Sequence, residues 1–254
     1  DEPSLLAAVS EARPDRVFHL AGHASVKSSF GSEEEIIQTN VLGTLHVLRA
    51  VREKAPAARV LYVGSAEEYG RSERQPLHED AKLLPITPYG VSRAAASLVA
   101  LRFALAEKLH VVRTRSFNHT GPGQSRDYVT PSFLAPLLEA RAKGERRIEV
   151  KTGDLSVRRD FSGVSGVVRA YRALLEKGTS GEVYNVCSGE AIALSELLAR
   201  LGRLTSVDPV SVPDPARMRP VDIPVLVGDP TRLERCIGSS LRGSLDEDLA
   251  VMAR

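Results

Sequence analysis

The chain alternates between two patterns of hydrophobic and polar positions. Short apolar segments bounded by turn residues predict β-strands, and longer segments with apolar residues at every third or fourth position predict helices. This alternation is typical of βαβ units, in which parallel strands form the core of an α/β domain. Loops are predicted at 65–87, 120–124 and 154–160. Strands are predicted at 16–22, 59–64, 111–117, 147–150 and 183–186, and helices at 33–54, 88–109, 131–143, 164–177, 194–201, 231–236 and 246–253.

Small and polar residues follow three of the predicted strands. They occupy His19–His23, Gly64–Glu68 and Ser116–Gln124. Ligands of open parallel sheets bind in the crevice beyond the carboxyl ends of the strands. All three segments lie at such ends. Together they therefore predict a ligand site more strongly than any single segment would.

One pair of residues on a predicted helix suggests proton transfer. Thr87 is placed to cap the helix that begins at Pro88. Tyr89 and Arg93 are four residues apart on this helix and therefore share one face. A cation beside a phenol lowers the pKa of the phenol, so Tyr89 could exchange a proton with a carbonyl or alcohol oxygen. Ser65, at the end of the preceding strand, could bind the same oxygen.

Composition narrows the class of ligand. The 34 basic and 32 acidic residues give a net charge of +2 without a basic run, which argues against a nucleic-acid partner. We expect neither a membrane span nor a signal peptide, because no apolar run is long enough. Cys187 and Cys236 have no metal-ligand or disulfide spacing and fit the reducing cytoplasm. His19 and His23 lack a third ligand, so no metal site is expected.

Several segments resemble motifs of the extended short-chain dehydrogenases/reductases, the NAD-dependent epimerase/dehydratase family. Tyr89-Gly90-Val91-Ser92-Arg93 resembles the Tyr-x-x-x-Lys signature, and Gly64–Gly70 resembles the strand end that carries the catalytic Ser or Thr. Together with five further segments, these two motifs extend over nearly the whole chain in the family's order. The other similar segments are His19–Gly22, Asn40–Thr44, Arg115–Gln124, Arg159–Phe161 and Arg219–Asp222.

The resemblance implies a Rossmann-like doubly wound parallel sheet with a smaller mixed α/β substrate domain. It implies NADP or NAD as the cofactor and a nucleotide sugar as the substrate. It also implies a homodimer formed through the two long helices that begin near Glu33 and Pro88. The cofactor domain would comprise 1–117 with 156–189, and the substrate domain 118–155 with 190–254.

The same resemblance assigns roles to individual residues. Arginines are expected at the diphosphate because the guanidinium binds phosphate oxygens in pairs. The catalytic residues are expected to be Ser65, Glu67, Tyr89 and Arg93. The expected cofactor-binding residues are Leu20, Ala21, Gly22, Asn40, Tyr89, Arg93, Phe117 and His119, and the expected substrate-binding residues are Ser65, Asn118, Arg159 and Arg219.

The expected activity is reduction of the 4-keto group of an NDP-4-keto-6-deoxyhexose. The segments 64–70 and 118–124 resemble those of the branch's reductases that act on GDP-4-keto-6-deoxymannose. Dehydratases of the branch carry an acid-capable residue directly after the Ser or Thr, where Ala66 cannot donate a proton. Glu67 remains a possible base, so 4,6-dehydration or 4-epimerisation stays open. Non-catalytic binding of a nucleotide sugar or dinucleotide also stays open.

The sequence departs from the family pattern in two places. Arg93 stands where the family has Lys, and a guanidinium can bind a ribose but does not deprotonate to relay a proton. In addition, no Gly-x-x-Gly-x-x-Gly or Gly-x-Gly-x-x-Gly follows a predicted strand. We expect the first βαβαβ with its pyrophosphate loop to precede Asp1, since a sheet that began at Arg16 would expose a buried-type edge strand.

Overall fold

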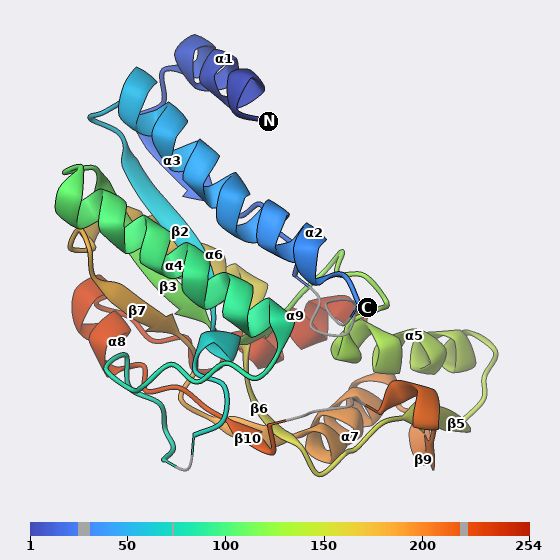
Figure 1. Cartoon of the computed structure of the whole chain (residues 1–254). Helices are drawn as coiled ribbons and strands as arrows, with labels where there is room; N and C mark the ends of the chain where they lie inside the picture. The colour runs from blue at the N-terminus through green and yellow to red at the C-terminus, as the bar shows by residue number, and fades with distance from the viewer. Residues whose placement is uncertain (25–30, 73, 219–222) are drawn as a thin grey trace. The chain divides into compact units, whose positions relative to one another are not determined.

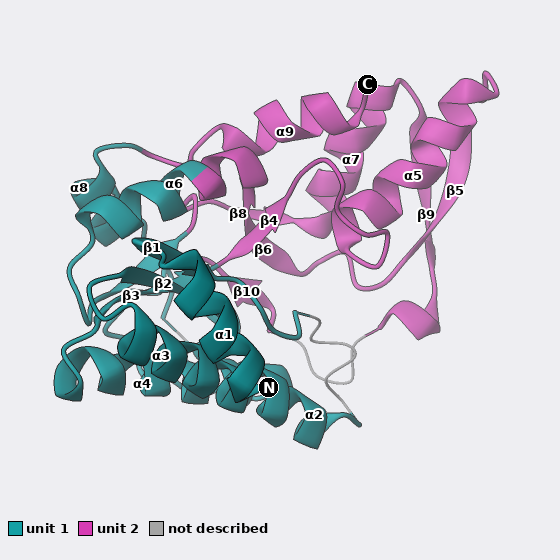
Figure 2. Cartoon of the chain, turned by 90° about the horizontal axis from the view of Figure 1, so that it is seen from above, with its two compact units in different colours: residues 1–116, 169–186, 229–239 teal, residues 117–168, 187–228, 240–254 magenta. Residues whose placement is uncertain are grey.

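The computed structural model describes residues 1–24, 31–72, 74–218 and 223–254. The chain divides into two compact units (Figure 2). The segment 156–168, expected in the cofactor domain, belongs to the second unit because its strand pairs with strands of that unit. The segment 229–239, expected in the substrate domain, belongs to the first unit. Unit 1 comprises 1–116, 169–186 and 229–239, and unit 2 comprises 117–168, 187–228 and 240–254.

A four-stranded parallel sheet forms the centre of unit 1, as the alternating pattern predicts (Figure 1). The first strand ends at His19 rather than at the predicted residue 22, so the residues that follow it form a loop. The register pairs Ser65 with Ser116 at the carboxyl ends of the two central strands. The sheet order is β1 (Arg16–His19), β2 (Arg59–Ser65), β3 (His110–Ser116) and β7 (Val183–Val186).

Helices α3 (Gly43–Lys54) and α4 (Pro88–Ala106) cover one face of this sheet. Figure 1 shows both helices in front of the strands, with α6 (Val164–Lys177) behind them. Leu48, Tyr62 and Phe103 are completely or almost completely buried in the core between the helices and the sheet. The first unit also contains α1 (Glu2–Ala12), α2 (Glu33–Ile37), the short helix η3 (Ala66–Glu68) and α8 (Thr231–Ile237).

The predicted helix 33–54 is not a uniform α-helix. A π-helical turn, η2 (Gln38–Leu42), separates α2 from α3. Such turns carry one extra residue and occur frequently at functional sites. Asn40 lies in this turn and is completely buried. The periodicity of apolar residues cannot reveal the turn, because the helical pattern continues on both sides of it.

Helix α1 was not predicted, and the reason is visible in its burial. None of its residues is buried, although it packs beside α3. Its capping signals were nevertheless present in the sequence. The Asp1 carboxylate accepts a hydrogen bond from the Ser4 N–H at 2.8 Å, and Pro3 lies in the first turn.

In unit 2, strand β6 (Arg158–Gly163) pairs with three other strands. The prediction of a charged loop at 154–160 was therefore wrong from residue 158 onward, because the polar residues of β6 have partners in the fold. Phe133, Leu197 and Leu249 belong to the core of this unit. The remaining elements are β4 (Asn118–Thr120), α5 (Val129–Ala142), β5 (Arg147–Thr152), β8 (Ala191–Ala193), α7 (Leu194–Thr205), β9 (Asp208–Pro213), η4 (Pro215–Arg217), β10 (Val225–Leu226) and α9 (Ser244–Met252).

Candidate active site

Tyr89 and Arg93 lie on the first turns of α4, at the carboxyl ends of the parallel strands. Thr87 caps the helix as predicted, since its hydroxyl accepts a hydrogen bond from the Gly90 N–H at 3.0 Å. Both side chains are buried, at 7% and 5% exposure. The Arg93 Nε donates to the Tyr89 hydroxyl at 3.3 Å, and the guanidinium carbon lies 5.3 Å from the centre of the phenol ring. The structure therefore places a cation directly on the candidate proton donor.

Two backbone carbonyls hold the rest of the Arg93 guanidinium. Nη1 donates to the Val63 carbonyl at 3.4 Å, and Nη2 donates to the His23 carbonyl at 3.3 Å. These carbonyls belong to β2 and to the loop after β1, so Arg93 connects two strand ends to α4. Burial alone would lower the pKa of Arg93, but the hydroxyls of Tyr89 and Tyr62 bring it above its ordinary value. Arg93 thus stays positively charged.

Asn40 connects the π-helical turn to the same cluster. Its Oδ1 accepts a hydrogen bond from the His23 N–H at 2.8 Å, and its Nδ2 donates to the Ser92 hydroxyl at 2.8 Å. The Ser92 hydroxyl in turn donates to the Tyr89 carbonyl at 2.8 Å. The buried amide therefore fixes both the loop after β1 and the first turn of α4. Both its donor and its acceptor are used within the protein.

The loop after β1 passes very close to the Arg93 side chain at Gly22. A Cβ atom at this position would lie 2.7 Å from Asn40 Oδ1 and 2.9 Å from Arg93 Nη2, and the φ angle is +153°. Only glycine fits this close approach without a shift of its neighbours. The adjacent Leu20 and Ala21 are exposed. Gly22 therefore lets the loop after β1 pack directly on Asn40 and Arg93, with Leu20 and Ala21 left on the surface.

Ser65 ends β2 and caps the short helix η3. Its hydroxyl oxygen accepts a hydrogen bond from the Glu67 N–H at 3.2 Å. The half-buried Glu67 follows directly after Ala66 on this helix. A Cβ at Gly90, beside Tyr89, would lie 2.5 Å from the Glu67 carbonyl oxygen, so η3 packs directly against the start of α4. The structure thus packs the segment that carries Ser65 and Glu67 against the helical turn that carries Tyr89.

His19 is connected to this cluster by a hydrogen-bond chain through Thr44 to Asn40. Its Nε2 and the Thr44 hydroxyl oxygen are 2.8 Å apart, and the Thr44 hydroxyl lies 2.6 Å from the Asn40 carbonyl, to which it donates. Since Thr44 has a single hydroxyl hydrogen, His19 must be the donor in the other bond. Burial, and then the nearby Arg93 charge, lower the pKa of His19 to about 4. His19 is therefore neutral at physiological pH.

The remaining predicted ligands belong to unit 2. Phe117 is buried, and Asn118 is half-buried in β4. His119 Nδ1 lies 3.2 Å from the Phe117 carbonyl, and burial lowers the pKa of His119. The buried Arg159 donates through Nη1 to the Ile223 carbonyl at 2.6 Å. Arg219 lies outside the described residues.

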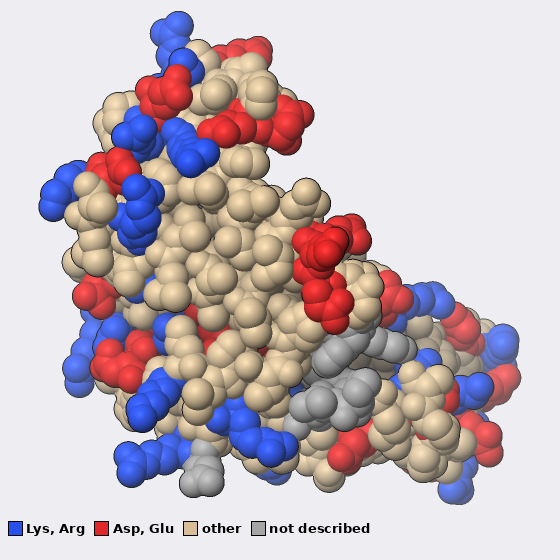
Figure 3. Space-filling view, viewed as in Figure 1, with Lys and Arg blue, Asp and Glu red and all other residues tan. Residues whose placement is uncertain are grey.

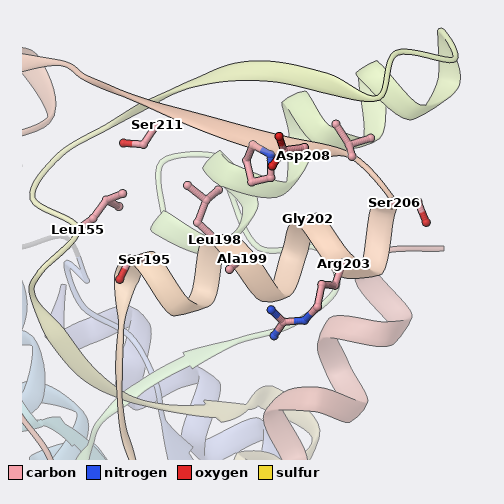
Figure 4. A pocket seen from close by; sticks show the side chains of 11 residues that line it. Leu155, Ser195, Leu198, Ala199, Gly202, Arg203, Ser206, Asp208 and Ser211 are labelled. Atoms are coloured by element: carbon pink, nitrogen blue, oxygen red, sulfur yellow. The ribbon is translucent and has the colours of Figure 1, made fainter.

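A groove in unit 2 does not coincide with any predicted site residue (Figure 4). It runs between α7 and β9 and is lined by the residues shown there, among them Leu198, Arg203 and Asp208. Within residues 1–24, 31–72, 74–218 and 223–254, no cluster of three or more His, Cys, Asp or Glu side chains could hold a metal ion. Over the same residues, no helix is long and apolar enough to cross a membrane.

Sequence reasoning missed three residues of the cluster. They are Ser92, Glu68 and His23, whose backbone carbonyl binds Arg93. Glu68 had a readable signal, because Ser65-x-x-Glu68 is the pattern of a capping box. Its side chain accepts a hydrogen bond from the Ser65 N–H at 3.0 Å. No local pattern marks His23 or Ser92, because their partners lie far away along the chain.

The parallel sheet with a hydroxyl, a phenol and a cation at its carboxyl edge defines the class, an α/β fold of the extended short-chain dehydrogenase/reductase type. A narrower assignment follows from a family model that matches residues 1–252 and is described as GDP-mannose 4,6 dehydratase. The chain belongs to this family.

Individual relatives share much of the chain. It is 36% identical over 239 residues to a GDP-6-deoxy-D-mannose reductase of Pseudomonas aeruginosa, covering 93% of this chain and 78% of the reductase. It is 31% identical to a dTDP-glucose 4,6-dehydratase of Streptomyces griseus, covering 93% of this chain and 70% of that enzyme. It spans only 29% of a trifunctional Arabidopsis thaliana relative. A solved structure of RMD from Pseudomonas aeruginosa complexed with NADPH is similar at a TM-score of 0.91 and 33% identity, over 100% of this chain and 84% of that one.

Proposed function

We propose that this protein is an NAD(P)H-dependent reductase of the 4-keto group of GDP-4-keto-6-deoxymannose. The observation that carries the proposal is the contact of Arg93 with the Tyr89 hydroxyl on α4, together with Ser65 at the carboxyl end of β2. Similarity to a GDP-6-deoxy-D-mannose reductase supports the substrate, and similarity to an NADPH-bound structure supports the cofactor.

In the proposed reaction, Tyr89 donates its hydroxyl proton to the carbonyl oxygen of the sugar. A nicotinamide cofactor, when bound, would supply the hydride that reduces the carbonyl carbon, so that C=O would become CH–OH. Ser65 can donate its own O–H hydrogen to the same carbonyl oxygen, because its oxygen lone pair already accepts the Glu67 N–H. Arg93 stabilises the phenolate that remains on Tyr89. Because a guanidinium does not deprotonate, the proton that restores Tyr89 must come through hydroxyl groups or water.

The other predicted ligands complete this proposal. For the cofactor we propose the loop Leu20-Ala21-Gly22, Asn40, Phe117 and His119. The exposure of Leu20 and Ala21, on a loop that packs on Arg93 through Gly22, supports this assignment. For the nucleotide sugar we propose Asn118, Arg159 and Arg219.

The second candidate is 4,6-dehydration, and the similarity to a dTDP-glucose 4,6-dehydratase supports it. Glu67 could serve as the base for removal of a C5 proton. The expulsion of water from C6 needs an acid, and Ala66 cannot supply one. We therefore favour reduction over dehydration. The remaining alternatives are 4-epimerisation and non-catalytic binding.

A single set of incubations separates reduction, 4,6-dehydration and non-catalytic binding. The protein is mixed with GDP-4-keto-6-deoxymannose and either NADPH or NADH, and in parallel with GDP-mannose and a catalytic amount of NADP or NAD. Oxidation of the reduced cofactor with formation of the 4-hydroxy sugar supports the reductase. Formation of the keto sugar from GDP-mannose supports the dehydratase instead. Binding of cofactor and sugar without conversion would reject both and leave the binding protein.

We also propose that two copies of the chain associate through α3 and α4. Figure 3 shows a broad surface without charged side chains where Figure 1 shows these two helices. Val91, Leu98 and Leu105 recur every seven residues along α4 and are 46%, 57% and 63% exposed. An apolar stripe of this kind supports a protein interface.

We place the protein in the cytoplasm, a proposal supported by its two free cysteines and testable by cell fractionation.

A further inference from the structure

Glu68 is a completely buried carboxylate that the proposed chemistry does not use. Its Oε1 accepts a hydrogen bond from the Ser65 N–H at 3.0 Å, and its Oε2 lies 3.1 Å from Arg115 Nε. A buried carboxylate is costly unless it is both paired and hydrogen-bonded. Both requirements are met here, and one of the two partners is the backbone of a proposed catalytic residue.

Arg115 is itself held in place, so it can act as a fixed anchor for Glu68. Its Nη1 donates to the Glu79 carbonyl at 2.8 Å, and its guanidinium lies 4.6 Å from the centre of the Tyr69 ring. Arg115 belongs to β3 and is only 5% exposed. The ion pair thus connects η3, which follows β2, to the neighbouring strand of the sheet.

The space around η3 leaves little room for another arrangement. A Cβ at Gly64 would collide with Glu68 Oε1 and also with the Thr114 carbonyl oxygen of β3, so only glycine fits before Ser65. On the other side, the Glu67 carbonyl packs against Gly90 at the start of α4. The short helix is therefore wedged between the Glu68–Arg115 pair and the turn that carries Tyr89.

This arrangement also decides which part of the Ser65 hydroxyl is available. Its oxygen accepts the Glu67 N–H at 3.2 Å, while the Ser65 N–H is bound to Glu68. Within the described part of the chain, no acceptor is found for the Ser65 O–H hydrogen. The capping box thus leaves the hydroxyl as a donor, which is the role needed at a carbonyl oxygen.

We propose that Glu68, anchored by Arg115, is a positioning residue that sets the Ser65 hydroxyl for hydrogen bonding to the substrate carbonyl. The inference rests on the proposed reductase function and deepens it. Loss of the carboxylate would let η3 shift away from β3 and α4. Small misplacements of groups around a reacting centre cost roughly a hundredfold in rate.

The test compares Glu68→Val with Glu68→Gln, each alone and combined with Ser65→Ala. Alone, Glu68→Val should lower kcat roughly tenfold to a hundredfold, with the affinity for NADPH unchanged. The kcat of Glu68→Gln should fall less, because the amide oxygen of Gln can still accept a hydrogen bond from the Ser65 N–H. In the Ser65→Ala background, Glu68→Val should have no further effect on kcat. An equal loss in both backgrounds would overturn the proposal, since Glu68 would then act without Ser65.

Hydrogen exchange gives a readout that does not depend on turnover. Glu68→Val should speed exchange of the Ser65 and Glu67 amides in full-length protein. Asp248→Asn is the matched control, because Asp248 is also a buried carboxylate that accepts a backbone N–H, from Ser165 at 2.9 Å. This control should leave exchange at 65–67 unchanged. Unchanged exchange in Glu68→Val would reject the positioning role. Absence of turnover in the wild-type protein would reject the reductase function instead.

Discussion

The Arg93 guanidinium both hydrogen-bonds the Tyr89 hydroxyl, at 3.3 Å, and lies over the Tyr89 ring, 5.3 Å from its centre. The cation is held there by contacts to three separate segments of the first unit. A Lys ammonium is a compact point charge without the planar fork that reaches several acceptors at once. The substitution at this position of the family signature is therefore accommodated by specific contacts.

Removal of the Tyr89 hydroxyl should abolish most of the activity. We expect Tyr89→Phe to lower kcat by about 10²–10⁴-fold, the usual contribution of a positioned acid. The ring can still pack under Arg93, so the melting temperature and the affinity for NADPH should change little. Steady-state kinetics and cofactor fluorescence measure the two effects. Turnover close to that of the wild type would mean that another group donates the proton.

Replacement of Arg93 separates its charge from its geometry. Arg93→Met should lower turnover by at least tenfold, because it removes the cation beside Tyr89. It should also cost roughly 1–3 kcal/mol of stability, because the Val63 and His23 carbonyls lose their partner. Arg93→Lys keeps the charge and should retain turnover within about tenfold. Urea denaturation and initial rates provide the measurements. A large gain in rate for Arg93→Lys would show instead that the guanidinium impairs the proton relay.

Gly22 should not tolerate a methyl group. In Gly22→Ala the Cβ would push against Asn40 Oδ1 and the Arg93 guanidinium, so we expect lower stability and weaker NADPH binding. Gly238→Ala is the control, since Gly238 has a φ of +77° and nothing within 4 Å of the added Cβ. Gly238→Ala should lower the free energy of unfolding by about 1 kcal/mol, because alanine is strained at a positive φ. It should not weaken NADPH binding. Equal effects of the two variants on NADPH affinity would contradict the close-approach argument.

His19 should make the stability depend on pH. Its folded-state pKa is about 4, below the ordinary 6.5, so the unfolded chain binds more protons between these values. The stabilising contribution is complete above pH 6.5 and is lost as the pH falls toward 4. Compared with His19→Gln, the wild-type protein should lose about 2–3 kcal/mol more between pH 7.5 and 4.5. Urea titrations at both pH values measure this difference, and parallel losses in the two proteins would argue against the burial of a neutral His19.

The apolar stripe on α4 should control the oligomeric state. Leu98→Glu places a charge at the centre of the stripe, so it should convert a dimer to a monomer in sedimentation velocity experiments. Val168→Glu is a control at a residue of α6 with similar exposure, 58% against 57%. It should leave the oligomeric state unchanged. A wild-type protein that sediments as a monomer would reject this interface.

Local patterns in the sequence were sufficient for the order of the main elements. The periodicities of 2 and 3.6 residues that predict strands and helices arise from the side-chain geometry of each element itself. The same holds for the cap at Thr87 and for the shared face of Tyr89 and Arg93, which depend on residues within one helical turn. Arg93 as the partner of Tyr89 was therefore predictable before the fold was known.

The tertiary structure decided what lies far apart along the chain. Glu68 meets Arg115 across 47 residues, and Asn40 meets Ser92 across 52 residues. The π-helical turn around Asn40 and the two carbonyl acceptors of Arg93, those of Val63 and His23, depend on such contacts as well. No local periodicity records these pairings, because they arise only when β2, β3 and α4 pack together. The sequence alone thus determined the chemical groups of the site, and packing determined their geometry.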